Sequence, residues 1–341
     1  MGTLSPAGPV VTDAQWIRVV DSGAAGTVRR AAAGLGAELG LDEQRVGELS
    51  IVAAEITTNV YKHAGDGHVL LRSLRLDDAG GVEIVAYDSG PGMVDAIRSG
   101  DDGHSTAGTL GIGLGAISRL ATRTDLYSMP GRGTVLTAQV WPARLRPDTP
   151  AEGLSRPMTG ESVCGDAWAV RHERRLQLLV CDGLGHGPLA ASAAAAAVDA
   201  FRHGPAGGPA TVVEHLHGAL GHTRGAAVAV AELDPGAGEL RFAGLGNIAG
   251  HIVTGAGERR GLVTLPGIAG HQRRVVREYT YPLGGGDLVV MHSDGVTDKW
   301  RLADYPGLAA GHTPLVVATT LLRDAGVRRD DATVLVARAG P

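Results

Sequence analysis

The sequence predicts a two-domain protein of the α+β class, and three observations carry that prediction. The chain has 341 residues, about twice the roughly 150 residues of a common domain, so each half can bury its own core. Helix-like and strand-like patterns occur in both halves without a repeating period. Hydrophobic residues make up 44% and charged residues 20%, which excludes a disordered chain, and no stretch approaches the roughly 18 apolar residues of a membrane helix.

Charge and cysteine content exclude several classes of partner and binding site. The 31 basic and 36 acidic residues give a net charge of -5, which leaves no basic region for nucleic acid or an anionic membrane. Neither Lys62 nor Lys299 ends a glycine-rich run of the P-loop type. Cys164 and Cys181 are too few for a disulfide framework and lack metal-ligand spacing. Residues 1–11 lack the basic segment followed by an apolar segment that is typical of a secretory leader, so we expect a cytoplasmic protein.

A proline-rich segment separates the predicted domains. Apolar periodicity is lost between residues 142 and 159, where the prolines are Pro142, Pro147, Pro150 and Pro157. This composition is typical of an interdomain linker. We therefore predict a first domain at 1–142, a linker at 143–150 and a second domain at 151–341.

The first domain is predicted to place a helix layer on a mostly antiparallel sheet. Apolar residues at helical spacing cover 35–64, and a second helix is predicted from about Gly113. The predicted strands are 69–76, 82–87, 125–127 and 134–140.

The second domain is predicted to be rich in short strands that form two packed sheets. Two strands at 167–170 and 177–182 come first, followed by an alanine-rich helix at 189–201 and a helix at 211–220. The later predicted strands are 228–233, 239–245, 248–254, 275–280, 287–293 and 332–337.

A helix in the first domain carries a candidate nucleotide-binding face. Glu55 and Asn59 are four residues apart, so both project from one side of the helix, with Lys62 and His63 one turn further along. An asparagine oxygen suits the shell of Mg²⁺, and a nearby carboxylate can accept the proton of an attacking hydroxyl. Taken alone, such a pair is more often simply solvated.

Three glycine-containing motifs follow this helix in the chain. Asp88 ends a predicted strand just before Gly90 and Gly92, and its carboxylate can accept a hydrogen bond from an adenine amino group. The run at 108–115 leads into a helix, where bare backbone and a helix N-terminus favour phosphate oxygens. Residues 131–134 read Gly-Arg-Gly-Thr before the last strand. Each motif alone is typical of an ordinary turn.

In this order, the four motifs resemble the GHKL (HATPase) ATP-binding fold shared by gyrase, Hsp90, histidine kinases and MutL. Residues 10–142 are similar to a short form of this fold, that of the anti-sigma-factor serine kinases and the RsbT-type switch proteins. The resemblance implies an α/β sandwich with a Bergerat-type ATP site, in which Asn59 is the Mg²⁺ ligand, Glu55 the general base and Asp88 the adenine contact. The further contacts with ATP that it implies are Lys62, Gly90, Gly92, Gly111, Gly113, Gly115 and Thr134.

The second domain carries acidic residues at strand ends and turns. Four of them attract attention: Asp166, Asp182, Asp294 and Asp330. Carboxylates brought together by converging strand ends repel one another unless cations lie between them, and hard oxygen ligands favour Mg²⁺ or Mn²⁺ over zinc. Two such ions can activate water for attack on phosphorus. A single Asp-Gly pair, in contrast, is usually only a tight turn.

Together these motifs resemble the PP2C (PPM) metal-dependent serine/threonine phosphatases, in the bacterial branch of SpoIIE, RsbU and RsbX. The resemblance covers 151–340 and implies an αββα sandwich with two Mn²⁺ or Mg²⁺ ions. It makes Asp182 and the carbonyl group of Gly183 bridging ligands, and a metal-bound water the nucleophile. The residues that complete the two metal shells are Asp166, Asp294 and Asp330.

Several assignments in this domain stay open. Asp331 is the alternative to Asp330 as the last carboxylate, and Asp298 is expected to cap or pair locally. His186 either packs beneath its loop or contacts the chemistry. No arginine that binds the phosphate is assigned, although Arg156 is a candidate by position.

The two resemblances together predict a kinase and a phosphatase that oppose each other in partner switching. The implied substrate is a phosphoprotein, an anti-sigma-factor antagonist with a STAS domain, and an anti-sigma factor or upstream sensor is a further possible partner. Two alternatives are a phosphatase governed by a nucleotide-binding module that transfers nothing, and a non-enzymatic scaffold that sequesters its targets. Neither nucleic acid nor membrane is expected as a partner, and a homodimer is possible.

Overall fold

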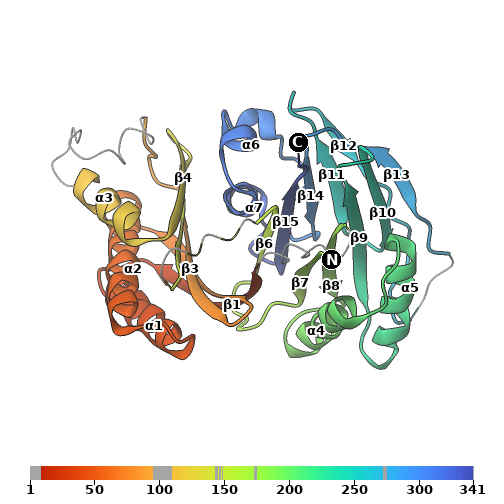
Figure 1. Ribbon diagram of the computed structural model, residues 1–341, viewed down its shortest axis with the longest axis horizontal. Coiled ribbons are helices and arrows are strands. Elements are labelled where there is room, and N and C mark those ends of the chain that lie inside the picture. The colour runs from red at the N-terminus through yellow and green to blue at the C-terminus, as the bar shows by residue number, and fades with distance from the viewer. Residues whose placement is uncertain are drawn as a thin grey trace, which may run out of the picture. The chain divides into compact units, whose positions relative to one another are not determined.

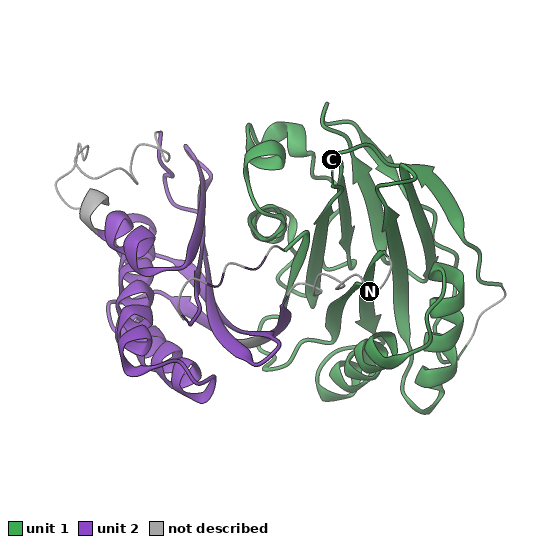
Figure 2. Ribbon diagram, in the orientation of Figure 1, with its two compact units in different colours: residues 1–7, 149–341 green, residues 8–148 purple. Residues whose placement is uncertain are grey.

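The computed structural model describes residues 9–94, 110–142, 145, 147, 149–172, 175–271 and 275–340. The chain divides between residues 148 and 149 into two compact units (Figure 2). The first unit covers Gly8–Asp148 and the second is built from Thr149–Pro341. Both mix helices with antiparallel sheets, so the predicted α+β class is confirmed.

The first unit holds one five-stranded antiparallel sheet in the order β1-β2-β3-β5-β4. Its strands are β1 (Val10–Val19), β2 (Gly67–Leu76), β3 (Ala79–Asp88), β4 (Arg123–Met129) and β5 (Gly133–Val140). Its helices, α1 (Ala24–Glu38), α2 (Glu43–Ala64) and α3 (Leu110–Leu120), lie on one face of the sheet (Figure 1). This is the sandwich that the first resemblance implied.

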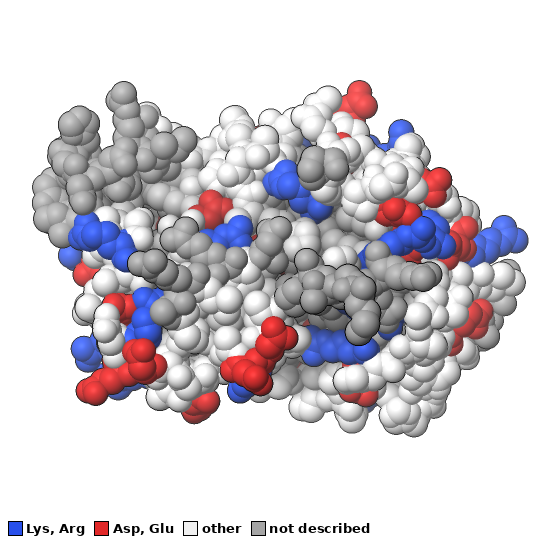
Figure 3. Space-filling view, viewed as in Figure 1, with Lys and Arg blue, Asp and Glu red and all other residues white. Residues whose placement is uncertain are grey.

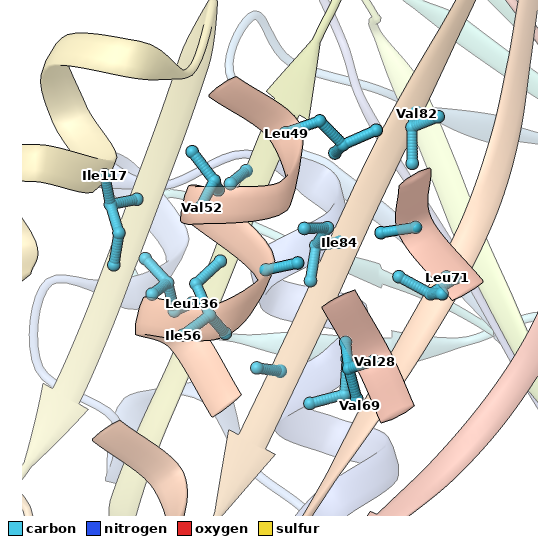
Figure 4. Close-up of a cluster of buried hydrophobic side chains, with 14 of the residues drawn as sticks. Val28, Leu49, Val52, Ile56, Val69, Leu71, Val82, Ile84, Ile117 and Leu136 are labelled. Carbon is cyan, nitrogen blue, oxygen red and sulfur yellow. The ribbon is translucent and has the colours of Figure 1, made fainter. Parts of the chain in front are cut away.

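Side chains from the helices and the sheet close the core of this unit. Val52 and Ile56 of α2 pack with Leu71 of β2, Ile84 of β3 and Leu136 of β5 (Figure 4). These residues recur at helical spacing in α2 and at alternate positions in the strands, which places them on the faces that meet. The packing fixes which side of α2 remains for a ligand.

The predicted single helical segment at 35–64 is wrong in one respect, because the structure divides it into two helices. Asp42 adopts an extended backbone conformation and its side chain accepts a hydrogen bond from the Arg45 N–H at 2.8 Å, so it caps a new helix. The helical spacing continues through the break, which is why periodicity alone did not reveal it.

Replacing the Asp42 cap tests this helix boundary. Asp42→Ala leaves an N–H group at the start of α2 without its partner and is expected to destabilise the first unit by about 1 kcal/mol. Urea unfolding of the full chain measures the shift. Asp78→Ala, which changes an exposed residue next to β3, is the control expected to move the midpoint little; equal midpoints for both variants would contradict the cap.

Other differences in the first unit have local causes. The strand β1 was not predicted, because a β-bulge between Asp13 and Gln15 interrupts its alternation. The helix α3 begins at Leu110 rather than near Gly113. Leu110, Leu114 and Ile117 keep helical spacing in the sequence, and the intervening glycines do not end the helix.

The second unit packs two five-stranded antiparallel sheets against each other. One has the order β13-β10-β9-β8-β7 and the other β12-β11-β14-β15-β6. The first is made of β7 (Asp166–His172), β8 (Leu176–Gly183), β9 (Ala226–Asp234), β10 (Glu239–Leu245) and β13 (Tyr279–Pro282). The second is made of β6 (Ala151–Arg156), β11 (Ala249–Val253), β12 (Arg259–Gly261), β14 (Leu288–His292) and β15 (Ala332–Arg338).

Helices cover the outer faces of both sheets (Figure 1). The alanine-rich α4 (Pro188–His203) and α5 (Pro209–Ala219) pack on the sheet that contains β8, and α7 (Pro314–Ala325) packs on β15 and β6. The short α6 (Leu308–Gly311) precedes α7. The layers therefore run helix, sheet, sheet, helix, which confirms the αββα sandwich.

Four segments of the second unit described below differ from the prediction. Residues 151–156, which lack clear apolar periodicity, form β6, and α7 was not predicted because its residues 314–322 are buried on every side and show no polar face. The strand predicted at 275–280 lies at Tyr279–Pro282 instead, and Val275 is 54% exposed. The short β12 was also missed.

Surface charge and helix length agree with the composition. Figure 3 shows acidic and basic side chains interspersed on the face that it draws. Among the described residues, none of the helices combines the length and the apolar character needed to cross a bilayer.

Candidate active sites

The second unit brings the four predicted aspartates to one place. Asp166 begins β7 and lies directly opposite Asp182 of β8 in the sheet register. Asp294 lies in the turn after β14, and Asp330 precedes β15. Both of these strands belong to the other sheet. Asp182, Asp294 and Asp330 line one cleft of about 670 Å³, and Asp166 is buried next to Asp182 with 4% exposure. The two sheets thus converge at a carboxylate cluster.

Two neutral side chains link these carboxylates. Asn247 donates from Nδ2 to Asp294 at 2.7 Å and, over a longer 3.4 Å, to Asp182. Ser293 donates its hydroxyl hydrogen to Asp166 at 2.5 Å. Neither side chain was predicted to be part of the site.

The cluster perturbs its own acidity. Burial, followed by the charge of Asp294, raises the pKa of Asp182 to about 7. Burial and the charge of Asp182 raise the pKa of Asp166 well above its usual value, against the opposing hydrogen bond from Ser293. Burial and Asp294 also raise the pKa of Asp330. Cations at this place would remove the repulsion, and an all-oxygen donor set fits Mg²⁺ or Mn²⁺.

These shifts predict how the metal-free protein responds to pH. A carboxyl whose folded pKa is raised disfavours the folded state above its unfolded pKa of about 4. The contribution of Asp182 to the stability of the metal-free protein should therefore fall as pH rises from about 4 through 7. The lowered pKa values of His251 and His292 act in the opposite direction, so the contribution is measured as the difference in melting temperature between wild type and Asp182→Asn, in chelator at pH 5 and at pH 8. Asp182→Asn should gain stability relative to wild type between pH 5 and pH 8, and the absence of that gain would contradict the clustering.

The neighbouring Asp331 has a different position from Asp330. Its two carboxylate oxygens accept the backbone N–H groups of Met158 at 2.7 Å and Gly165 at 2.8 Å. Asp331 is 3% exposed and fixes the two segments next to β7, whereas Asp330 lines the cleft. The geometry therefore favours Asp330 as the ligand and gives Asp331 a structural task.

A glycine allows β8 to end close to α4. A Cβ atom at Gly183 would lie 2.3 Å from the carbonyl oxygen of Ala190, so no larger residue fits without moving the helix backbone. The Gly183 N–H donates to the Gly165 carbonyl at 3.0 Å, which ties the end of β8 to the residue before Asp166. This close packing positions Asp182 at the floor of the cleft.

The cationic groups near the cleft are only partly those expected. Arg156 donates to the carbonyl oxygen of Val327 at 2.8 Å, whereas Arg329, which no prediction named, lines the cleft next to Asp330. His186 also lines the cleft, and its Nδ1 lies 2.9 Å from Glu161. The only sequence signal for Arg329 is its position next to the aspartate.

The first unit contains a separate cavity of about 190 Å³ between α2 and the sheet. Of the predicted ATP contacts, it is lined by Asn59, Asp88, Gly92 and Thr134, together with apolar side chains. Asp88 accepts the Gly90 N–H at 2.8 Å, and Thr134 shares a hydrogen bond of 2.9 Å with Ser128. An apolar slot with a carboxylate at its edge fits an adenine ring.

The start of α3 meets the polar face of α2 beside this cavity. A Cβ atom at Gly113 would lie 2.8 Å from Glu55 Oε2 and 3.6 Å from Asn59 Oδ1. The Nδ2 group of Asn59 is buried and makes no hydrogen bond within the described residues. The structure therefore brings Glu55, Asn59 and the glycine-rich helix start together, and leaves one buried polar group there without a hydrogen-bond partner among the described residues.

The remaining predicted contacts are placed less directly. Lys62 is exposed, whereas His63, one residue further, lines the cavity. Gly111 and Gly115 lie in α3. Residues 108 and 109 of the glycine run lie outside the described residues. Gly90 packs against Ala64 at the end of α2.

Comparison with known proteins assigns each unit to a different family model. Residues 20–140 match the histidine kinase-like ATPase domain. Residues 172–340 match stage II sporulation protein E.

Two proteins of Bacillus subtilis (strain 168) are similar to parts of this chain. The chain is 34% identical to the serine/threonine-protein kinase RsbT over 104 residues, which are 30% of this chain and 78% of RsbT. It is 22% identical to the phosphoserine phosphatase RsbX over 179 residues, which are 52% of this chain and 88% of RsbX. A solved structure described as "The bacterial stressosome: a modular system that has been adapted to control secondary messenger signaling" is 33% identical, with a TM-score of 0.50. That match covers 55% of this chain and 98% of the solved chain.

Proposed function

The chain joins a histidine kinase-like ATPase domain of the RsbT family to a SpoIIE-type serine/threonine phosphatase domain, and from that premise we propose that it both phosphorylates and dephosphorylates a protein antagonist of an anti-sigma factor. The relatives are a kinase and a phosphoserine phosphatase by name. One chain that holds both sites can set the phosphorylation state of one partner from both directions. The substrate we propose is a STAS-domain antagonist, released or captured by an anti-sigma factor according to its phosphate.

The phosphatase half rests on one observation, the convergence of Asp166, Asp182, Asp294 and Asp330 at a single cleft. Burial and the neighbouring carboxylates raise the pKa values of Asp166, Asp182 and Asp330, and divalent cations between the carboxylates would offset this repulsion. Asp182, with the Gly183 carbonyl group, would bridge two divalent ions. Asp166, Asp294 and Asp330 would complete their coordination.

The chain's own groups position the phosphate ester for hydrolysis. When bound, the two ions supply the positive charge that activates water and offsets the charge of the phosphate. Asn247 holds the Asp182 and Asp294 carboxylates in place through its amide N–H groups. Arg329 lies on the rim of the cleft and is suited to contact a phosphate oxygen.

The kinase half is supported by the contact of the α3 start with Glu55 and Asn59. Asn59 would bind the Mg²⁺ that accompanies ATP, and Asp88 would accept a hydrogen bond from adenine. Glu55 would take the proton of the substrate hydroxyl as it attacks the terminal phosphate. Gly113 lets the backbone of α3 approach these side chains, where the phosphates of ATP would lie.

A phosphatase assay on the proposed substrate tests this function. The antagonist, phosphorylated on its serine or threonine, is expected to lose its phosphate when the chain and Mn²⁺ or Mg²⁺ are both present. Excess chelator should stop the release, because the negatively charged aspartates cannot activate water or offset the charge of the phosphate without the ions. Measured phosphate release that continues unchanged in chelator would contradict the two-ion assignment.

A further inference from the structure

We propose that His251, His292 and Asp298 form an additional binding site for one transition-metal ion of the zinc type. His251 lies on β11, His292 ends β14, and Asp298 lies in the turn that follows β14. None of these residues belongs to the aspartate cluster described above. From the sequence, Asp298 was expected to cap or pair locally.

The three side chains present their ligand atoms toward one point. One atom from each lies within 4.8 Å of the others. The Asp298 carboxylate lies 2.8 Å from His251 Nε2 and 3.7 Å from His292 Nε2. The two imidazole rings stack with their centroids 5.8 Å apart. An ion between them would draw the nitrogens and the oxygen to the usual distances of about 2.0 to 2.2 Å with small side-chain movements.

His251 is the strongest sign of a ligand at this place. Its side chain is 8% exposed, and its Nδ1 makes no hydrogen bond within the described residues. Its Nε2 lies 2.8 Å from the Asp298 carboxylate, close enough to interact with that group but outside standard hydrogen-bond geometry. Burying a polar group without a hydrogen bond is costly, so a native structure rarely leaves one in this state. A metal bond to Nε2 would satisfy it.

His292 is already oriented as a ligand. Its Nδ1 lies 2.9 Å from the carbonyl oxygen of Ser293, so that nitrogen carries the hydrogen and Nε2 keeps its lone pair. Metal-binding histidines commonly donate their second ring N–H to a backbone carbonyl group in this way. The Trp300 N–H reaches the same Nε2 only at 3.3 Å, a weak contact that a metal bond would replace.

The donor set selects the class of ion. Two imidazole nitrogens and one carboxylate suit zinc and other late first-row metals, whereas Mg²⁺ and Ca²⁺ prefer oxygen ligands alone. Asp298 has 57% of its side chain exposed, so water can complete the coordination from the solvent side. The site therefore differs in chemistry from the all-oxygen aspartate cluster.

An ion pair network is the competing explanation. Arg259 lies 3.2 Å from the Asp298 carboxylate and stacks over Trp300 at 4.7 Å. Arg259 and both histidines approach the same carboxylate oxygen, Oδ1. The N–H groups of Arg259 donate to Asp298 and to the carbonyl oxygen of Trp300. The network therefore leaves the His251 ring nitrogens without a hydrogen bond of standard geometry, whereas a metal ion would bind Nε2.

The position of the site gives the ion a structural task. His292 contacts the Ser293 carbonyl group, and the Ser293 hydroxyl group binds Asp166. An ion held by His251 and His292 would therefore join β11 to the end of β14 and steady the turn that carries Asp294. It would act on the phosphatase through geometry, without touching the substrate.

Copper is a spectroscopic probe for this site. The full-length protein, with excess Mg²⁺ to occupy the aspartate cluster, receives one equivalent of Cu²⁺, and electron paramagnetic resonance should show coupling to two imidazole nitrogens. His251→Gln should leave coupling to one nitrogen. The control is His203→Ala, because His203 is an exposed histidine that also contacts an aspartate, Asp199, and it should leave the spectrum unchanged.

If His251→Gln fails to fold, a substitution at an exposed position still tests the proposal through zinc binding. Asp298→Ala changes a largely exposed side chain and should weaken binding of one Zn²⁺ per chain, in excess Mg²⁺, by about tenfold or more. Titration calorimetry measures the change against His203→Ala. The proposal is overturned if wild-type protein binds no zinc under these conditions, or if Asp298→Ala and His203→Ala bind it equally.

Discussion

The Asp182→Asn variant is expected to lose phosphatase activity by about a thousandfold or more, while its metal-free form becomes more stable. Asp182 would bridge both ions, and an amide at this position carries no negative charge to hold them. Loss of metal activation is worth several kcal/mol of the barrier, and each 1.36 kcal/mol is about tenfold in rate. Phosphate release from the phosphorylated antagonist in Mn²⁺ measures the first effect, and thermal unfolding in chelator the second.

The opposite directions of these effects distinguish a metal ligand from a residue that simply maintains the fold. Asp182 is disfavoured as an anion by burial and by Asp294, so removing its charge relieves repulsion that only cations otherwise remove. Asp199→Asn, at an exposed position on α4, is the control and should change neither quantity. Retained turnover in Asp182→Asn, or reduced stability together with lost activity, would contradict the assignment.

The Glu55→Ala variant is expected to keep ATP binding and lose phosphate transfer to the antagonist by about 10²- to 10⁴-fold, the usual contribution of a general base. Glu55 lies against the start of α3, whereas the cavity that fits adenine is lined by Asn59, Asp88 and other residues but not by Glu55. Removing the carboxylate should therefore spare the affinity for nucleotide. Label transfer from ATP measures the rate, and titration calorimetry the binding.

The matched control lies on the same helix. Glu43→Ala changes an exposed glutamate in the first turn of α2 and should leave transfer within about twofold, since ordinary surface substitutions have small effects. If wild-type protein binds ATP yet transfers no label to the antagonist, the kinase half is wrong and the first unit only reads nucleotide. The phosphatase results would stand in that case, because they depend on different residues.

The second unit shows what sequence could and could not predict of a site. Asp166, Asp182, Asp294 and Asp330 were identified because each lies at the end of an apolar strand or in a turn, and antiparallel sheets bring such ends together. Asn247 and Ser293 were missed because single neutral residues carry no comparable signal. Their contribution depends on which strands meet, and strand order is a property of the whole fold.

The choice between neighbouring aspartates illustrates the same limit. Asp330 and Asp331 are equivalent in the sequence, and only the backbone N–H groups that reach Asp331 separate them. In the first unit, the sequence pattern predicted the buried face of the helix but not the boundary between α1 and α2 at Asp42. A helix cap is a single residue, and the apolar period continues through it. Apolar periodicity and composition predict helices and strands. The role of a single residue depends on contacts between segments far apart in the sequence, which these patterns do not show.

The proposal that one chain both adds and removes the same phosphate can be tested in a single time course. Wild-type protein, the antagonist, Mg²⁺ and a limiting amount of γ-labelled ATP are mixed, and label on the antagonist is followed. The account predicts that protein-bound label first rises and then, once ATP is exhausted, falls while labelled inorganic phosphate appears. Label that never reaches the antagonist, or that reaches it and persists after the ATP is gone, would contradict it.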